Sequence, residues 1–185
     1  MKKFLLLVAL FLINQLHPYE NKIDLLSLYK DLHANPELSY QEFETSEKLA
    51  NLLESIGYEV TRNVGGNGVV ALLKNGNGKN IMFRADMDGL PVEEKTGARY
   101  ASKKKVTNLD GEEVFTMHAC GHDVHMTVLI GVAEYLFENK SEWQGNLILV
   151  LEPAEEVSGG ARNMIKDGLF TRFPRPDYNL AFHVN

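Results

Sequence analysis

The run Leu147 to Leu151 is the feature that most limits the fold, because it places five apolar residues in succession between Asn146 and Glu152. A short strand that is apolar on both faces has to be covered on both faces. Helix-like and strand-like segments alternate along most of the chain, which favours helices packed on a sheet. We therefore predict an α/β fold in which a mixed, mostly parallel sheet is flanked by helices on both faces.

Periodicity and turn signals place the remaining elements. Ser39 and Glu42 form a capping-box pattern that opens a helix, and Gly57 closes that helix. The sequence Asn75-Gly76-Asn77-Gly78 is a strong hairpin signal between two strands. A polar loop is expected over 101–115, with a turn at Asp110-Gly111. The other helices are expected over 22–34, 122–138 and 160–167, and the strands over 69–73, 81–85, 147–151 and 180–184.

The N-terminus differs from the rest of the chain. Lys2 and Lys3 precede an apolar run from Phe4 to Ile13 that is too short to span a bilayer as a helix. This pattern predicts a signal peptide over residues 1–20 and an exported protein, periplasmic or secreted. If the run is instead a buried helix, the protein is cytoplasmic. Residues 21–185 are expected to form the N-terminal part of one domain.

Charge argues against a nucleic-acid partner. The net charge is −6, and the only basic run, Lys103-Lys104-Lys105, lies in a polar stretch. No segment is suited to a stable membrane span. Cys120 is the only cysteine, so no disulfide can form within the chain, and the thiol is either free or has a function.

Three clusters carry side chains suited to chemistry, and two of them follow predicted strands. In open α/β sheets, ligands bind beyond the carboxyl ends of the strands. Asp86 and Asp88 follow the strand that ends at Ala85, and alternate residues of a strand share a face. An acid-rich turn is the simpler alternative. Glu155 and Glu156 lie shortly after Leu151. This pair is either a metal ligand beside a general base or part of an ordinary charged loop.

The remaining cluster lies at the start of the helix over 122–138. Cys120 and His122, with His118 and His125 beside them, offer a thiolate and imidazoles, which are good ligands for zinc-like ions. A helix N-terminus and a bound cation would both lower the pKa of the thiol. The alternative is a buried structural cysteine beside surface histidines. His183 stands in the last apolar strand, where a core histidine is the commoner explanation.

Three motifs in this order resemble the amidohydrolase branch of the metallopeptidase family that includes aminoacylases and glutamate carboxypeptidases. That branch contains hippurate hydrolases, N-acyl-amino-acid amidohydrolases and plant auxin-conjugate hydrolases. The motifs are RADMDGLP at 84–91, MHACGHDVHM at 117–126 and PAEEVSGGARNMIKDGLF at 153–170. The resemblance runs from about Leu28 to the end of the chain and implies a zinc-exopeptidase-like catalytic domain.

The resemblance also implies a role for each site residue. Cys120 would bridge two divalent metal ions (zinc, manganese, cobalt or nickel), His122 and His183 would hold one ion, and Glu156 would hold the other. Glu155 would be the general base. Asp88 matches the aspartate of the wider family's H-x-D motif, which orients a ligand. Asp86 stands where that motif has a histidine ligand, so the sequence departs from the wider pattern there.

These roles imply hydrolysis of the amide bond of small N-acyl amino acids or similar conjugates by metal-activated water. A dipeptidase or carboxypeptidase of the same fold is the alternative. The chain ends two residues after His183, whereas the resembling proteins continue into a lid domain, which also forms their dimer contact, and a late histidine ligand. We therefore expect an incomplete domain with little activity alone, or a non-catalytic metal-binding fragment.

Overall fold

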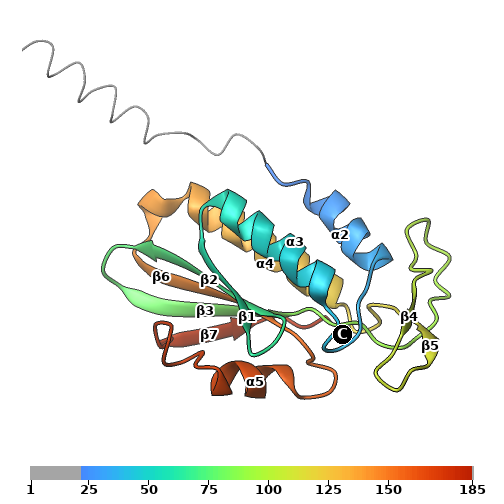
Figure 1. Ribbon diagram of the computed structural model, residues 1–185. Helices are drawn as coiled ribbons and strands as arrows, with labels where there is room; N and C mark the ends of the chain where they lie inside the picture. The colour runs from blue at the N-terminus through green and yellow to red at the C-terminus, as the bar shows by residue number, and fades with distance from the viewer. Residues whose placement is uncertain (1–21, 185) are drawn as a thin grey trace, which may run out of the picture.

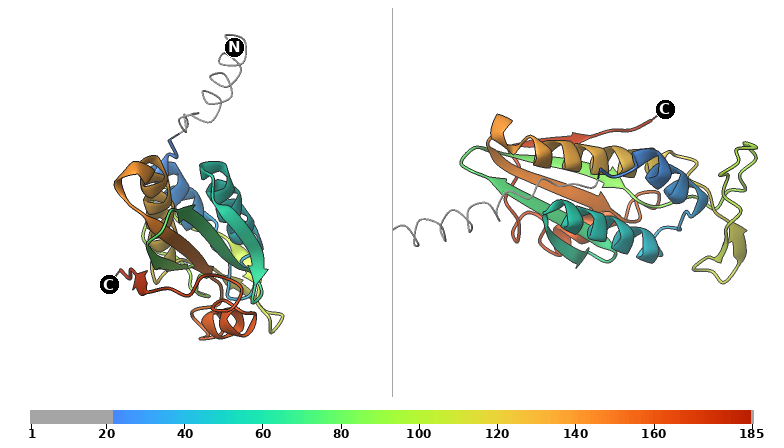
Figure 2. Two further views of the ribbon diagram at one scale, coloured as in Figure 1. Left: turned by 90° about the vertical axis from the view of Figure 1, so that its left-hand side faces the viewer. Right: turned by 90° about the horizontal axis from the view of Figure 1, so that it is seen from above.

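A computed structural model describes residues 22–184. Its main sheet has five strands in the order β1-β2-β6-β3-β7, namely Glu59–Val64, Gly68–Asn75, Gly145–Glu152, Lys79–Asp86 and Tyr178–Ala181. Helices α2 (Leu25–Ala34), α3 (Phe43–Ile56) and α4 (His122–Glu138) cover one face, and α5 (Gly160–Lys166) covers the other (Figures 1 and 2). The predicted mixed sheet flanked by helices is confirmed, but the sheet is not mostly parallel, because two of its strand pairings are parallel and two are antiparallel.

The predicted hairpin across residues 75–78 is wrong. Strand β6 lies between β2 and β3, pairing antiparallel with β2 and parallel with β3. The chain does reverse at this turn, but the turn passes over β6, which lies between β2 and β3. Gly78 and Gly145 allow the backbone of the turn to approach the backbone at the start of β6 closely. The physical reason is the apolarity of β6: all but one of its residues are buried, so it occupies the interior of the sheet with a partner along each edge.

Alternate residues of the central strands build two separate cores. Val69, Ala71, Leu149 and Leu151 point toward the α2, α3 and α4 side, where Leu49 and Leu129 are fully buried. The intervening residues, such as Val70 and Ile148, pack on Met164 of α5 and on Leu169. This period-two alternation explains why a strand that looks uniformly apolar in sequence needs helices on both faces.

The helix boundaries agree closely with the prediction, but one cap does not form. Helix α4 spans His122–Glu138 as predicted, and Gly57 closes α3 in the left-handed conformation. Helix α3, however, begins at Phe43, and the side chain of its N-cap residue Glu42 does not cap it. Ser39 instead donates a hydrogen bond to Asp88 at 2.6 Å, so a tertiary contact replaces the expected local one.

Two edge regions differ from the prediction. The sequence does not predict the edge strand β1, because the segment 59–64 is mostly polar or charged, and in the structure only Val64 of this strand is buried. The expected loop over 101–115 contains the small antiparallel pair β4 (Lys105–Thr107) and β5 (Glu113–Phe115) around the predicted turn. This pair lies apart from the main sheet, beyond the end to which β3 and β6 point (Figure 1).

The prediction of a buried last strand over 180–184 is also wrong. Strand β7 ends at Ala181, all four of its residues are exposed, and His183 lies beyond its end. Burial cannot be read from apolarity alone, because β7 lies at the sheet edge with β3 along one side. The signal peptide predicted over residues 1–20 lies outside the described residues. Within 22–184, no helix has both the length and the hydrophobicity to cross a membrane.

Candidate metal centre

Strands β3 and β6 bring two of the predicted clusters together. The two strands run parallel, and Asp86 at the end of β3 lies opposite Glu152 at the end of β6. The chain therefore leaves both strands at the same end of the sheet, as predicted. The N-terminus of α4 meets them there, because α4 packs on β3 and β6.

His122, the first residue of α4, lies at the middle of this arrangement and is fully buried. Its Nδ1 is 3.4 Å from Asp88 Oδ1, and its Nε2 is 3.6 Å from Asp86 Oδ2. The same Nε2 lies 3.7 Å from Glu155 Oε2 and 3.7 Å from Glu156 Oε1. Four carboxylates, from the end of β3, from the segment after it and from the loop after β6, thus surround one imidazole.

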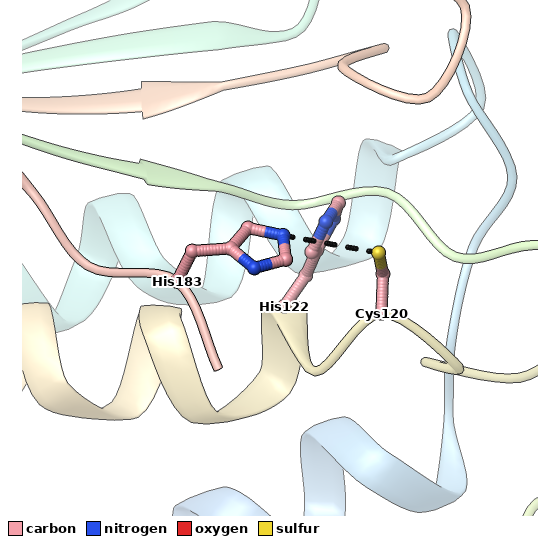
Figure 3. A group of neighbouring side chains, drawn as sticks. All are labelled: Cys120, His122 and His183. Carbon is pink, nitrogen blue, oxygen red and sulfur yellow. Dashed lines mark hydrogen bonds between the residues drawn. The ribbon is translucent and has the colours of Figure 1, made fainter. Parts of the chain in front are cut away.

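Cys120 and His183 complete one side of the centre. Cys120 Sγ lies 3.8 Å from His183 Nε2, and these two residues and His122 offer donor atoms that all lie within 4.8 Å of one another (Figure 3). Gly121 makes this geometry accessible. Its φ of +78° suits glycine, and a Cβ there would lie 2.1 Å from a methyl carbon of Val184.

Several buried atoms of the centre have no hydrogen-bond partner. They are both ring nitrogens of His122, Asp88 Oδ1 and Glu156 Oε1. Buried polar atoms are normally satisfied, and each orphan costs about 1–3 kcal/mol. Nitrogen, sulfur and carboxylate donors are the set that binds zinc-like divalent ions, so the residues fit such ions.

The acid–base properties of the centre also favour a cation. Burial, followed by the charge of Glu156, raises the pKa of the Cys120 thiol. The expectation that the helix N-terminus lowers this pKa is therefore not met by the protein groups alone, because desolvation and nearby carboxylates outweigh it. Burial and the charge of Asp86 likewise raise the pKa of Glu155. A bound cation would reverse both effects by stabilising the thiolate and the carboxylate.

Asp88 holds the centre in place. Its carboxylate accepts hydrogen bonds from Ser39 Oγ at 2.6 Å and from the Glu156 backbone N–H at 3.0 Å. Burial opposes ionisation of Asp88, but the interaction with His122 and these hydrogen bonds leave its pKa below the ordinary value. Asp88 therefore ties the loop that carries Glu155 and Glu156 to the end of β3.

The structure brings most, but not all, of the site residues predicted from the sequence into groups of close donor atoms. Cys120, His122 and His183 form one group of close donors, and Asp88, His122 and Glu155 form another. Glu156 belongs to neither group, although it reaches His122. A third group, Asp86, His122 and His125, contains two residues to which the sequence assigned no ligand role.

Two buried histidines behind the centre have different surroundings. His118 has no hydrogen-bond partner on either ring nitrogen, and burial lowers its pKa to about 4. His33 was not predicted as part of the site. It lies 2.6 Å from Asp123 and 3.0 Å from Glu94, bracing the start of α4. Nothing in the local sequence around His33 signals this pairing, because 90 residues separate it from Asp123.

Comparisons with known proteins agree with this geometry. The signature described as "Peptidase family M20/M25/M40" matches residues 82–185. The hippurate hydrolase of Campylobacter jejuni is 46% identical over 153 residues, covering 82% of this chain and 37% of that protein. The N-acetyl-L-cysteine deacetylase of Bacillus subtilis is 41% identical, covering 78% of this chain and 33% of that protein.

A solved structure is similar over the same region. The Bacillus subtilis YXEP protein, described as a dinuclear metal-binding peptidase from the M20 family, has a TM-score of 0.69 and 37% identity. The alignment covers 78% of this chain and 38% of that structure. The chain thus spans between a third and two fifths of the length of these three similar proteins.

Proposed function

Because the chain belongs to peptidase family M20/M25/M40, we propose that its protein hydrolyses the amide bond of N-acyl amino acids or similar conjugates with the help of divalent metal ions. The observation that carries this proposal is His122. It is fully buried, both of its ring nitrogens lack a hydrogen-bond partner, and Asp86, Asp88, Glu155 and Glu156 lie within 3.4–3.7 Å of it. The names of the similar hippurate hydrolase and N-acetyl-L-cysteine deacetylase support an acyl amino acid as the substrate.

We propose Cys120, His122, Glu156 and His183 as the residues that hold two metal ions. Bound divalent ions supply a Lewis acid for the amide carbonyl and lower the pKa of water. Donor type supports this assignment, since one thiol, two imidazoles and a carboxylate suit zinc, manganese, cobalt or nickel. The orphaned Glu156 Oε1 and His122 Nε2 are the atoms that an ion would satisfy, while His122 Nδ1 faces Asp88 Oδ1 at 3.4 Å.

Glu155 is proposed as the general base. It lies beside the buried His122, and 37% of its side chain is exposed, so water can reach its carboxylate. A bound cation beside it would keep this carboxyl ionised, which is the form that can accept a proton. Glu155 takes a proton from the attacking water and later gives it to the leaving amine nitrogen. Asp88 keeps Glu155 and Glu156 in place through the Glu156 backbone N–H.

The test uses the protein expressed from its complete reading frame, loaded with metal and assayed against hippurate, N-acetyl amino acids and dipeptides. We expect release of the free amino acid from the acylated substrates. Glu155→Gln should lower kcat by about 10²–10⁴-fold while metal content stays unchanged. The matched control is Glu138→Gln, at the exposed far end of α4, which should behave as the parent protein.

Two results would contradict the proposal. One is the absence of amide hydrolysis by the metal-loaded protein against every substrate class, which would leave a non-catalytic metal-binding protein. The other is a Glu155→Gln variant as active as the parent. Activity confined to dipeptides would instead indicate a dipeptidase with the same centre.

We also propose that the protein is exported, since the charged and apolar residues of 1–20 are typical of a signal peptide. The test is fractionation of cells that express the chain with and without residues 1–20. Export lost on deletion supports the proposal, and equal distribution of both forms contradicts it.

A further inference from the structure

A pocket of about 250 Å³ opens beside the candidate metal centre. Three segments line it, residues 38–41, 89–91 and 108–110, together with Glu156 and Val157. We call it the side pocket. Its volume lies just below the range of roughly 300–1,000 Å³ that holds drug-sized ligands, so it suits a smaller chemical group.

The side pocket adjoins the metal centre at Glu156. Glu156, a proposed metal ligand, forms part of its lining. Ser39, which also lines the pocket, donates a hydrogen bond to Asp88, and Asp88 accepts the backbone N–H of Glu156. A substrate whose carbonyl lies at the centre can therefore place one of its two halves in the side pocket.

The pocket wall is mainly apolar, and several of its apolar side chains are exposed to solvent. Leu109 is 73% exposed, Val157 is 55% exposed and Tyr40 is 39% exposed. Leucine and valine side chains that gather at this exposure around a concave surface commonly mark a binding site. Their carbon atoms offer the contact that an apolar group of a substrate would bury.

Charge distinguishes the two halves of an N-acyl amino acid. The charged residues that line the side pocket are Asp110 and Glu156, both acidic, and neither lysine nor arginine lines it. Asp110 would repel the free carboxylate of the amino-acid half, and the lining holds no lysine or arginine to pair with it. The acyl half carries no charge, so the pocket favours it.

The side pocket is also held in shape without a ligand. Tyr40 has a φ of +66°, and its hydroxyl packs so closely on Gly159 that a Cβ on this glycine would lie 1.8 Å from the oxygen. Gln41 donates a hydrogen bond at 3.1 Å to the carbonyl of Thr107, which ties the β4–β5 pair to the turn at 38–41. Binding then needs little ordering of the wall.

From these observations we propose that the side pocket binds the acyl half of the substrate and selects an uncharged, apolar acyl group of several carbons. The proposal rests on the proposed function for the position of the amide bond. Burial of one CH₂ is worth about 0.8 kcal/mol, which corresponds to about a fourfold change in Kd or in kcat/KM per methylene.

The first measurement needs no turnover. Straight-chain primary amides from acetamide to hexanamide are titrated into the protein, and the methyl signals of Leu109 and Val157 are followed by NMR. We expect both signals to shift and Kd to fall by up to about fourfold per added methylene.

The second measurement compares kcat/KM for N-acetyl and N-hexanoyl derivatives of one amino acid. We expect the hexanoyl substrate to be favoured, and Leu109→Ser to reduce that preference by at least about fourfold, the value of one buried CH₂. The matched control is Leu26→Ser, since Leu26 is 60% exposed on α2 and does not line the pocket. It should leave the preference unchanged.

The two measurements separate failure of the pocket from failure of the proposed function. Hydrolysis with no dependence on acyl length, together with unshifted methyl signals, overturns the side-pocket proposal alone. A preference that follows the amino-acid side chain instead also overturns it. No hydrolysis of any substrate, together with the expected gradient of amide binding, overturns the hydrolase proposal and leaves the pocket as an apolar binding site.

Discussion

His125 Nδ1 lies 2.6 Å from Asp86 Oδ1, and Nε2 of the same ring accepts a hydrogen bond from the Val184 backbone N–H at 3.0 Å. Because Nε2 is the acceptor, Nδ1 carries the proton and donates it to Asp86. Arg84 holds the other oxygen of Asp86 at 2.7 Å. Asp86 thus connects the end of β3 to α4 and, through His125, to the segment after β7.

This relationship predicts a strong coupling between Asp86 and His125 in stability. In a double-mutant cycle of Asp86→Asn and His125→Phe, we expect a coupling free energy of about 1.5–3 kcal/mol, because the hydrogen bond is buried and one partner is charged. Urea denaturation measures it. The exposed pair Lys105 and Glu113, 2.9 Å apart, is the control and should show only about 0.2–1 kcal/mol. Equal coupling in the two pairs would contradict the prediction.

Cys120→Ser should reduce the metal content of the purified protein. The thiol is the softest donor beside His122, and its replacement by a hydroxyl should weaken binding by at least about tenfold. Elemental analysis after dialysis measures the number of ions per chain. Thr116→Val is the control, since Thr116 is a buried residue near the same loop whose hydroxyl lacks a partner. Unchanged stoichiometry in Cys120→Ser would remove Cys120 from the centre.

Gly121→Ala should destabilise the fold more than Gly76→Ala does. Both glycines have a φ of +78°, so alanine is similarly strained at the two positions. Only at Gly121 does the new Cβ meet a neighbour, Val184 Cγ2 at 2.1 Å, whereas nothing lies within 4 Å at Gly76. We expect about 1 kcal/mol for Gly76→Ala and about 1–3 kcal/mol more for Gly121→Ala, measured by thermal unfolding.

A second substitution tests the cause of that difference. Val184→Ala in the Gly121→Ala background removes the methyl group that the new Cβ would meet, so it should restore part of the lost stability. No recovery would show that the cost arises from the backbone of the Cys120–His122 turn alone.

Glu42→Gln should change how stability depends on pH. Burial raises the folded-state pKa of Glu42 above its ordinary value of 4.5, although hydrogen bonds from Asn67 and the Ala154 backbone oppose the rise. Between pH 4.5 and that raised pKa, the folded chain binds more protons than the unfolded chain. The free energy of unfolding therefore falls as pH increases through this window and levels off above it.

Glutamine keeps an acceptor and cannot ionise, so the fall should be absent in Glu42→Gln. Urea denaturation at several pH values should show the variant gaining stability relative to the parent as pH rises from about 4 toward 7. Glu44→Gln, at an exposed position on α3, is the control and should follow the parent. A constant difference between Glu42→Gln and the parent across this range would contradict the prediction.

The local sequence pattern correctly predicted the elements whose bounds depend on neighbouring residues. The bounds of α4 and the closure of α3 at Gly57 depend on residues within one or two turns. The spacing of Cys120 and His122 before a helix likewise indicated a metal centre. The apolar run in β6 was enough to predict a buried strand, because its burial pattern needs no knowledge of the partner strands.

The tertiary structure decided what depends on distant partners. A turn signal at 75–78 reports that the chain reverses there, but the choice of β6 as the neighbour of both β2 and β3 depends on burial of the whole sheet. Ser39 bonds to Asp88 across 49 residues in place of capping α3. The sequence by itself therefore determined which residues are suited to the proposed metal chemistry, because residue type and local spacing set their donors. Only the packed sheet decided which of these residues meet. The reason is that β6 and the end of α4 are buried by contacts with segments far away in the sequence.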